Sequence, residues 1–539
     1  MIELLTKINE EYFKMPNLMT IKEASVWASK YLNKNVTASN ISYLIQYGRI
    51  PKIGDNGSTC VSVNDLKEYY NDNNDTRENL WKKKFGNDLN WDLSFSQYKE
   101  SETTKHVHRL HSYKGKFIPQ LVEYFLDNHT DNFKKQVFFN KNDIILDPFC
   151  GSGTTLVQAN ELGINSVGID ISAFNAFISN MKIGKHNIAS IENSIELITN
   201  KLEDFQKKKN NVQFEIELLE KLKPFNAKYF PSPAFKYKVR YNEINELEYG
   251  KLKSKEFLKT YNKLIKKYKI SLKQDAQSSF LDKWFLKVIR DEIEFVFKEI
   301  KNIKDEDTRH LLALVLSRTV RSCRATTHAD LATLKEPIIK TYYCKKHGKI
   351  CKPIFSIMNW WKRYTQDTIN RILEFNELRT DTSQRCLIGD SRTINIVKEL
   401  KERDKDFAKL IKDKRINGIF SSPPYVGLID YHEQHAYAYD LMGFERRDKL
   451  EIGPLYNGQG VEARKSYVKG ISEVLLNCKK YLTNDYDVFL VANDKYGLYP
   501  EIAKLANMKI INEYKRPVLN RVEKDRSAYA EIIFHLKEQ

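Results

Sequence analysis

The spacing of apolar and polar residues predicts a small N-terminal domain made of helices and a hairpin. Thr20 stands three positions before Glu23, a capping box that predicts the start of a helix. Thr37 is a suitable N-cap for a second helix, ASNISYLIQYGRI. The next stretch, PKIGDNGSTCVSV, predicts two strands joined by a turn at Asn56-Gly57, and NDLKEYY predicts a closing helix. Together these elements predict a winged helix-turn-helix domain within residues 1–75.

Further along, the apolar pattern predicts a doubly wound α/β sheet. The buried-type run IILD is followed by a glycine-containing loop, the helix TTLVQANELG and a second strand, SVGIDIS. We therefore predict that residues 80–180 form the first part of this domain. Strand patterns return in 381–539 as RCLIGDSR, INGIFSSPPY and DVFLVAND, followed by two antiparallel strands around a charged loop. The charged, mostly helical stretch 181–380 is predicted to be an insertion into the sheet.

The charge balance favours a polyanionic partner. The chain has 88 Lys and Arg against 70 Asp and Glu, a net charge of +18, and nucleic acid is the simplest partner for such a balance. A general bias toward Lys, Asn and Ile explains part of this excess, so the charge alone does not decide the partner. We find no run of 18 apolar residues and no basic-then-apolar leader, which predicts a protein without a membrane span or secretory signal.

Seven cysteines are scattered along the chain, and this odd, widely spaced set argues against a disulfide framework and for a reducing cytoplasm. Three potential metal ligands, Cys344, His347 and Cys351, lie in YYCKKHGKICKP. Their spacing matches no standard zinc site, and a fourth ligand is not evident. The sequence therefore favours the absence of a metal site and leaves open whether these three residues bind zinc.

The loop DPFCGSGTT has the composition of a ligand-binding turn. Gly151 and Gly153 allow the backbone to turn tightly and to approach a ligand. The loop lacks the lysine of a P-loop and the third glycine of a dinucleotide fingerprint. Asp170 ends the next strand, where a carboxylate can accept both hydroxyls of an adenosine ribose, and Asp147 is placed to face an ammonium group directly or through water. A ribose and a cationic amino-acid tail occur together in S-adenosylmethionine, the predicted cofactor.

A second chemical signal is SSPPY, which directly follows the apolar strand NGIF. Two prolines fix the backbone and lack N–H donors, so nearby carbonyl groups are left as acceptors. With Ser422, such acceptors suit an exocyclic amino group, which must donate hydrogen bonds. Tyr425 offers a face against which an extruded base can stack. Taken alone, the motif is equally compatible with a proline-rich structural turn.

Together, DPFCGSGTT and SPPY resemble the amino-methyltransferases of DNA, the enzymes of restriction–modification systems. A serine-led S-P-P-Y is typical of the N4-cytosine branch, whereas adenine-N6 enzymes usually carry Asp or Asn in that place. HSYKGKFIPQ, CLIGDSR, RPVLNR and YAEIIF are similar to further motifs of the family. The resemblance covers about residues 105–180 and 385–539 and leaves the helical insertion as the target-recognition region by elimination. Here the cofactor motif precedes S-P-P-Y, the reverse of the order in many N4-cytosine enzymes, so the branch is left open.

The resemblance implies a Rossmann-like methyltransferase sheet and roles for the motif residues. It implies target-base binding and catalysis by Ser422, Pro423, Pro424 and Tyr425. Cofactor contacts are implied for Lys116, Phe117, Asp147, Phe149, Gly151, Gly153, Thr154, Thr155, Asp170, Ser172 and Asp390.

Two groups of residues outside these motifs are predicted to contact double-stranded DNA. The N-terminal domain resembles the small DNA-binding domains of excisionases and related regulators, and protein contact is its alternative role. Its second helix, the recognition helix of this resemblance, carries Ser39, Asn40 and Tyr43. In SRTVRSCRATTH, three arginines recur every third residue on one predicted helical face, where they grip phosphates, face solvent or form internal ion pairs: Arg318, Arg321 and Arg324.

The combined prediction is a cytoplasmic, nucleoid-associated bacterial DNA methyltransferase that transfers a methyl group from S-adenosylmethionine to cytosine N4 in duplex DNA. The resemblance also implies a cognate restriction endonuclease as a partner. The alternatives are adenine-N6 methylation by the same fold, a non-catalytic DNA-binding regulator, and methylation of RNA or protein, because glutamine methyltransferases carry a related N-P-P-Y. The sequence decides neither the recognition site nor the oligomeric state.

Overall fold

The computed structural model describes residues 18–32, 36–54, 59–74, 77–275, 278–327, 336–519 and 528–539. The chain forms two compact units, each assembled from three stretches of sequence. The sheet unit comprises Trp81–Lys209, Ser271–Pro337 and Ile354–Gln539, and the N-terminal unit comprises Met1–Leu80, Asn210–Ile270 and Ile338–Pro353. Within the described ranges, no helix has the length and apolar character needed to cross a membrane.

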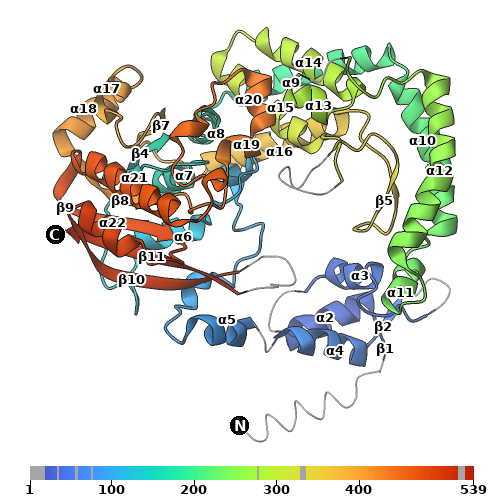
Figure 1. Ribbon diagram of the computed structural model, residues 1–539, viewed down its shortest axis with the longest axis horizontal. Coiled ribbons are helices and arrows are strands. Elements are labelled where there is room, and N and C mark those ends of the chain that lie inside the picture. Colours follow the sequence, from blue (N-terminus) through green and yellow to red (C-terminus); the bar gives the residue numbers. More distant parts are fainter. Residues whose placement is uncertain are drawn as a thin grey trace, which may run out of the picture. The chain divides into compact units, whose positions relative to one another are not determined.

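The sheet unit is organised around a seven-stranded mixed sheet (Figure 1). Its strands are β3 Ile144–Asp147, β4 Asn165–Asp170, β7 Gln384–Ile388, β8 Ile416–Ser421, β9 Leu482–Ala492, β10 Met508–Val518 and β11 Tyr529–Glu538. They follow the order β10-β11-β9-β8-β3-β4-β7. The strands from β9 to β7 are parallel, and β11 is antiparallel to both of its neighbours. The predicted doubly wound sheet with a C-terminal antiparallel pair is therefore confirmed.

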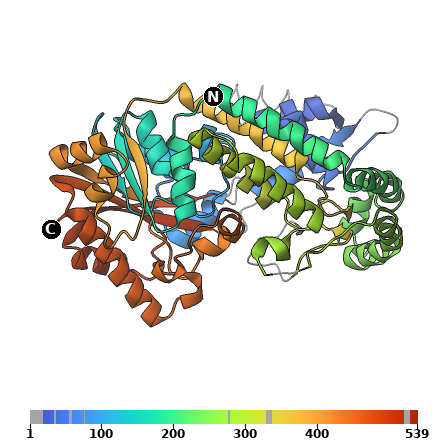
Figure 2. The ribbon, with the colours of Figure 1, turned by 90° about the horizontal axis from the view of Figure 1, so that it is seen from above.

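Helices cover both faces of this sheet, because successive side chains of each strand point to opposite faces. Ile144 and Leu146 of β3 belong to an apolar core that also holds residues of α17, α18, α21 and α22, whereas Ile145 packs with residues of α6 and α7. Both views show the strands between the two groups of helices (Figures 1 and 2). The bounds are α6 Pro119–Leu126, α7 Thr154–Glu161, α17 Ile396–Lys401, α18 Lys405–Lys414, α21 Val461–Lys479 and α22 Tyr499–Leu505. Burial on both faces explains the nearly continuous apolar strands.

The sheet unit contains further helices beside this three-layer core, and α15 packs against α8, α9, α14, α16 and α20. The α-helices are α8 Ala173–Ile183, α9 Ile188–Lys207, α13 Phe280–Trp284, α14 Lys287–Lys301, α15 Glu306–Ser322, α16 Met358–Asn376, α19 Tyr431–Gln434 and α20 Ala436–Met442. Short 3-10 helices are η1 Asp92–Ser94, η2 His106–Arg109, η4 Asp448–Leu450 and η5 Leu455–Asn457. Helix α5 (Arg77–Phe85) runs across the boundary of the two units.

The first part of the N-terminal unit contains the predicted helices. Their bounds and those of the short strands are β1 Leu18–Thr20, α2 Ile21–Tyr31, α3 Ala38–Gln46, β2 Cys60–Ser62 and α4 Val63–Asn74. The predicted capping box of α2 is confirmed, and Thr37 caps α3 through a reciprocal pair with Asn40. The predicted turn at Asn56-Gly57 lies outside the described residues, while Ile53 and Cys60 on either side of it form an antiparallel bridge.

The stretch 181–380, which we predicted to be one insertion, is divided between the two units. Helices α10 (Asn211–Tyr229), α11 (Ala234–Arg240) and α12 (Glu246–Tyr268) belong to the N-terminal unit, as do strands β5 (Tyr342–Cys344) and β6 (Lys349–Cys351). Helices α9 and α13 to α16 belong to the sheet unit. The helical pattern of this stretch predicted its secondary structure, but periodicity along one helix does not say which distant partner covers its apolar face.

Candidate functional site

A cavity lies at the carboxyl ends of β3, β4, β7 and β8. Its volume, open mouth included, is about 830 Å³. Residues at all four strand ends line it, together with the segments 113–117 and 450–452. The chain builds the sheet outward in both directions from β3, with β4 and β7 on one side and β8 and β9 on the other. Ligands of open α/β sheets bind at such switch points.

The glycine loop between β3 and α7 forms one wall of the cavity. Gly151 and Gly153 have left-handed backbones, with φ of 51° and 74°. A Cβ atom at Gly151 would lie 2.9 Å from the Tyr113 hydroxyl oxygen, and one at Gly153 would lie 2.9 Å from the Cβ and Oγ of Ser179. Both positions therefore require glycine for backbone conformation and for space. Gly151 lines the cavity, as does Thr154 at the start of α7.

Asp170 faces the cavity from the end of β4. Its Oδ2 accepts the Gly151 N–H at 2.8 Å, and its Oδ1 accepts the Ser172 N–H at 2.8 Å and the Asn175 side-chain amide at 3.2 Å. Burial raises the pKa of Asp170 to about 7, although these hydrogen bonds act in the opposite direction. A carboxylate has about four acceptor positions. Three of these positions are occupied, so the carboxylate keeps one position, on Oδ2, for a ligand hydroxyl. We predicted that it would accept two hydroxyl groups.

Two buried polar atoms beside Asp170 complete this wall. Among the described residues, the Oδ1 of Asn175 and the Oγ of Ser152 have no hydrogen-bond partner, and both residues line the cavity. Buried polar atoms are normally paired, so these two atoms are candidates to bind a ligand. Ser172 is different, because its Oγ lies 2.6 Å from the Tyr439 hydroxyl and caps α8. Its hydroxyl does not line the cavity, in contrast to the predicted cofactor contact.

We predicted that Asp147 contacts the ammonium group of a ligand. In the structure, Asp147 lies behind the cavity wall. Its carboxylate is 1% exposed and accepts the Ser421 hydroxyl at 2.5 Å and the Phe149 N–H at 3.2 Å. Burial raises its pKa to about 6. Thr155 is also buried, and its hydroxyl donates to the Phe420 carbonyl at 3.4 Å. Both residues thus join the glycine-loop segment to β8 and do not line the cavity.

The end of β7 supplies Asp390, which lines the cavity. Arg392 holds its carboxylate with two hydrogen bonds, from Nε to Oδ1 at 2.9 Å and from Nη2 to Oδ2 at 2.6 Å. Next to it, the Ser391 hydroxyl donates to the Pro148 carbonyl at 2.6 Å. The chain after β7 is therefore tied to the glycine loop, in which Phe149 also lines the cavity.

The segment before α6 forms another wall and contains the predicted Lys116 and Phe117. The Lys116 ammonium donates to the His108 carbonyl at 2.8 Å, and its pKa is lowered to about 8, mainly by burial. The Phe117 ring meets the Phe420 ring edge-on at 5.5 Å. Tyr113 stacks on Tyr431 with ring centres 6.1 Å apart, so aromatic side chains from two segments border the cavity.

The serine-proline motif follows β8, and part of it reaches the cavity. Ser422 and Pro424 line it, whereas Pro423 and Tyr425 do not. The Ser422 hydroxyl donates to the Val491 carbonyl at 3.0 Å, so its oxygen keeps lone pairs that can accept. The Tyr425 hydroxyl donates to Glu531 Oε1 at 2.7 Å. Arg516 is buried beside Glu531, with its Nη1 3.8 Å from Oε2.

The candidate DNA-contact residues of α3 are exposed. Ser39, Asn40 and Tyr43 lie on the solvent side of this helix. The Asn40 Oδ1 accepts the Thr37 N–H at 2.8 Å, so its amide nitrogen is the group that remains able to reach a base edge. The Tyr43 ring packs on Tyr47 with a centroid distance of 4.2 Å.

The three arginines do not share one exposed helical face. Arg318 is buried; its Nη1 lies 2.6 Å from Asp367, and its guanidinium covers the Tyr364 ring. Of the three alternatives predicted for these arginines, Arg318 forms the internal ion pair. Helix α15 ends at Ser322. Arg321 is half-exposed near this end, and Arg324 lies two residues beyond it. Arg321 and Arg324 line a second depression in the sheet unit, together with Lys114.

Several lining residues were not predicted from the sequence. Ser152 and Tyr113 lie inside the motifs DPFCGSGTT and HSYKGKF, so a residue-by-residue reading of these motifs could have found them. Asn175 lies one turn after the N-cap of α8, and no feature of the sequence indicated that it lines the cavity. Tyr431 reaches the cavity from the start of α19, and Glu451 reaches it from the residue that follows η4.

Comparison with known proteins gives consistent matches. A family model described as DNA methylase, of the N6 and N4 methyltransferases, matches residues 9–181. The chain is 45% identical over 527 residues to the type II methyltransferase M.MjaII of Methanocaldococcus jannaschii, covering 96% of this chain and 97% of that protein. It is 24% identical to M.BsoBI of Geobacillus stearothermophilus over 66% of this chain and 56% of that protein. It is 34% identical to M.MvaI of Kocuria varians over 21% and 23% of the two chains.

Proposed function

This chain belongs to the type II DNA methyltransferases, and from that premise we propose that it methylates the N4 amino group of cytosine in duplex DNA. Family membership makes it a transferase that acts on DNA with S-adenosylmethionine as cofactor. The finer assignment is supported by one observation. A glycine loop and a serine-led S-P-P-Y segment line the same cavity, with Ser422 and Pro424 on its surface.

The cavity residues fit the cofactor. Glycine is the one residue that fits the turn at Gly151, and the unpaired Asn175 Oδ1 lies beside the Asp170 carboxylate. We infer that these two acceptors share the hydroxyl groups of the cofactor ribose, one each, since Asp170 keeps one free acceptor position. When bound, S-adenosylmethionine supplies an electrophilic methyl group on a sulfonium sulfur.

The protein's contribution is to present the amino group as a nucleophile. The lone pair of cytosine N4 is delocalised into the ring. The Ser422 hydroxyl oxygen lines the cavity and accepts one N–H group, which holds the nitrogen closer to tetrahedral geometry and frees the lone pair. The Pro423 carbonyl, which does not line the cavity, accepts the other N–H group only if the S-P-P-Y segment shifts when DNA binds. The same contacts orient the nitrogen toward the cofactor. Ser422 is suited to this role because its own proton is already donated to Val491.

Base extrusion follows from the position of N4 on the base-paired edge of cytosine. We infer that the extruded ring lies against Tyr425, which follows the cavity-lining Pro424 and whose hydroxyl is held by Glu531 at 2.7 Å. Tyr425 and Glu531 are partly buried, so the aromatic ring is positioned before DNA binds. Glu531 is therefore a positioning residue, which acts through Tyr425.

DNA binding is proposed for the N-terminal unit, with α3 entering the major groove as the recognition helix of a winged helix-turn-helix domain. Ser39 and the Asn40 amide nitrogen are its base-reading groups. In the sheet unit, Arg321 and Arg324 line a depression that Lys114, Asp430 and Glu433 also line, and the two arginines are proposed to bind phosphates there. A restriction endonuclease that cuts the same DNA sequence is the expected functional partner.

Product analysis tests the assignment. Purified protein is incubated with deuterated-methyl cofactor and DNA, and the digested nucleosides are separated by mass spectrometry. N4-methylcytosine is expected, and Ser422→Ala is expected to remove most of it while Ser271→Ala, in an exposed turn of the same unit, has full activity. N6-methyladenine as the sole product would assign the protein to the adenine branch. Cofactor binding without methylation of any nucleobase would indicate a regulator.

A further inference from the structure

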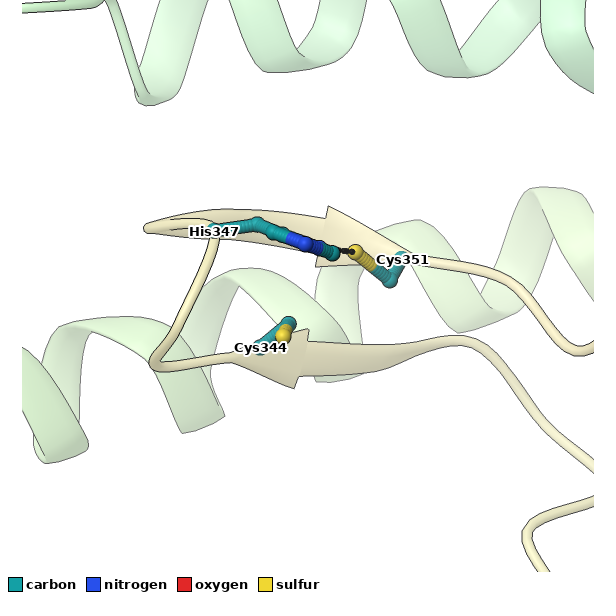
Figure 3. Close-up of side chains that lie close together, drawn as sticks. All are labelled: Cys344, His347 and Cys351. Carbon is teal, nitrogen blue, oxygen red and sulfur yellow. Dashed lines mark hydrogen bonds between the residues drawn. The ribbon is translucent and has the colours of Figure 1, made fainter. Parts of the chain in front are cut away.

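The hairpin of the N-terminal unit brings three potential metal ligands together. Strands β5 and β6 pair antiparallel, with Tyr342 opposite Cys351 and Cys344 opposite Lys349. Opposite residues share a face of the sheet, as do residues two apart. Cys344 and Cys351 are therefore diagonal neighbours on one face. Figure 3 shows both side chains with His347, which comes from the turn between the strands.

The turn directs His347 toward the two cysteines. The N–H groups of His347 and Gly348 donate to the Cys344 carbonyl at 3.1 and 2.7 Å. Gly348 has φ of 60°, a left-handed conformation that suits glycine and folds the loop back on the strands. As a result, the His347 Nδ1 lies 3.4 Å from the Cys351 Sγ (Figure 3).

The ligand atoms are close to the spacing that zinc requires. The Cys344 Sγ, the Cys351 Sγ and a His347 ring nitrogen lie within 4.8 Å of one another. With zinc bonds of about 2.3 Å to sulfur and about 2.0 Å to nitrogen, the ligand atoms of a tetrahedral site lie roughly 3.5 to 3.8 Å apart. The observed separations need only small side-chain rotations to reach this range.

We propose that Cys344, His347 and Cys351 bind a zinc ion, with water in the fourth position. Two thiolates and a neutral imidazole are a common donor set for zinc, and the two thiolates balance the charge of the ion. Two of the ligand residues lie at the surface of the hairpin, with His347 exposed and Cys351 half-buried, so an ion can reach them from solvent.

A second group of potential ligands lacks these properties. His106, His108 and Glu161 also lie within reach of one ion. However, the Lys105 ammonium already lies 2.6 Å from a Glu161 oxygen. Positive charge on Lys116 and Lys182 also acts on His108. A divalent cation there would face several ammonium groups, so the hairpin is the stronger candidate.

Zinc would add stability to this short hairpin. Each strand has three residues, and an isolated two-stranded hairpin is at best marginally stable. The hairpin nevertheless anchors its neighbours. Asn226 of α10 bonds with both the N–H and the carbonyl of Ile350, at 3.0 and 2.9 Å, and the Tyr343 hydroxyl donates to Glu246 of α12 at 2.7 Å.

The hairpin turn is also linked to the chain that follows α3. The ammonium of Lys236, on α11, donates to the Lys345 carbonyl at 2.8 Å. From the same helix, Arg240 donates to the Gly48 carbonyl, and Tyr237 bonds to Ile50 and Lys52. A metal-stapled turn would therefore hold α11 and, through it, the loop behind the proposed recognition helix.

Metal analysis of the untagged, full-length protein tests this proposal. The protein is expressed with zinc in the medium, purified under reducing conditions without a chelator, and its metal content is measured by mass spectrometry. About one zinc per chain is expected. Cys344→Ser and Cys351→Ser should lose it, whereas Cys60→Ser, a half-buried cysteine of the same unit outside the cluster, should keep it.

Cobalt substitution gives a readout that does not depend on stability. The wild-type protein loaded with Co²⁺ should show a thiolate-to-cobalt charge-transfer band, weaker in each cysteine variant. His347→Asn should lower zinc affinity more than about tenfold, while His310→Asn, an exposed histidine of the other unit, should not. A wild-type protein without zinc and without this band, or zinc retained in both cysteine variants, would overturn the proposal.

Discussion

The Ser421 hydroxyl donates a 2.5 Å hydrogen bond to the Asp147 carboxylate and so joins two chemical motifs that lie far apart in the sequence. Asp147 ends β3 and begins the glycine loop, and Ser421 ends β8 and begins the S-P-P-Y segment. The two strands are parallel neighbours, so their carboxyl ends meet at one edge of the sheet. This bond fixes the distance between the glycine loop and the S-P-P-Y segment.

Ser421→Ala is expected to lower both stability and activity. The buried Asp147 carboxylate would lose its shortest hydrogen bond, at a cost of about 1–3 kcal/mol in the free energy of unfolding. The turnover number should fall more than cofactor affinity, because the S-P-P-Y segment loses its anchor. Urea unfolding and methylation kinetics measure both effects. Ser166→Ala is the matched control, since the hydroxyl of this buried β4 serine has no partner among the described residues. Equal losses in the two variants would contradict this role of Ser421.

Gly153→Ala is expected to abolish cofactor binding. The added methyl group would meet Ser179 at 2.9 Å, and a left-handed backbone costs a non-glycine residue about 1–2 kcal/mol. Gly443→Ala separates these two effects, because Gly443 has a similar φ of 71° but no atom within 4 Å of the position that the added methyl group would take. The control should show the backbone cost alone in thermal unfolding and retain normal cofactor affinity in calorimetry. A functional Gly153→Ala enzyme would show that the loop tolerates a wider turn.

Cofactor affinity should increase with pH through about 7. Burial raises the pKa of Asp170 to about 7, so the carboxylate is mainly protonated at pH 6 and mainly ionised at pH 8. Only the ionised form offers all its acceptor positions. The dissociation constant should therefore fall by up to about tenfold over this interval. Asp170→Asn should bind weakly and without this pH dependence. A transition centred near pH 6 that persists in Asp170→Asn would point to Asp147 instead, since its pKa is about 6.

Glu531→Ala is expected to lower the turnover number with little change in cofactor affinity. Its carboxylate holds the Tyr425 hydroxyl at 2.7 Å, and without it the ring loses its fixed orientation. Glu531→Gln keeps an acceptor for this hydroxyl and should recover most of the activity. Such a recovery would not be expected if Glu531 acted only through its negative charge. Tyr481→Phe, which removes a hydroxyl at the amino end of β9 away from Tyr425, is the control for the loss of a side-chain hydrogen bond. Single-turnover methylation measures the chemical step in all three variants. Equal turnover in Glu531→Ala and the wild type would remove Glu531 from the mechanism.

Arg318 and Arg321 should respond differently to alanine substitution. Arg318→Ala breaks a partly buried ion pair with Asp367 and should destabilise the sheet unit by about 1–3 kcal/mol. Arg321→Ala should leave stability within about 0.5 kcal/mol of the wild type. It should instead weaken DNA binding and reduce the slope of log affinity against log salt by about 1. Chemical unfolding and salt-dependent binding assays provide the two measurements. An unchanged salt slope in Arg321→Ala would show that this arginine touches no phosphate.

The sequence determined those features that depend on short stretches of chain. The capping box at Thr20 and Glu23 is a contact between residues three positions apart, and its helix starts where predicted. Two prolines after a buried strand and two glycines in a loop limit the backbone locally, whatever surrounds them. For these reasons the strand-loop-helix order and the parallel sheet could be predicted, together with most of the motif residues that line the cavity.

Tertiary structure alone decided what each side chain meets. The pairing of β3 with β8 places Asp147 against Ser421 and withdraws it from the cavity, and the packing of α15 buries Arg318 against Asp367. The β5–β6 register brings Cys344 next to Cys351, a proximity that their linear spacing conceals. Local preferences set the backbone within a few residues, whereas burial, ion pairing and ligand grouping depend on contacts between segments that can be hundreds of residues apart.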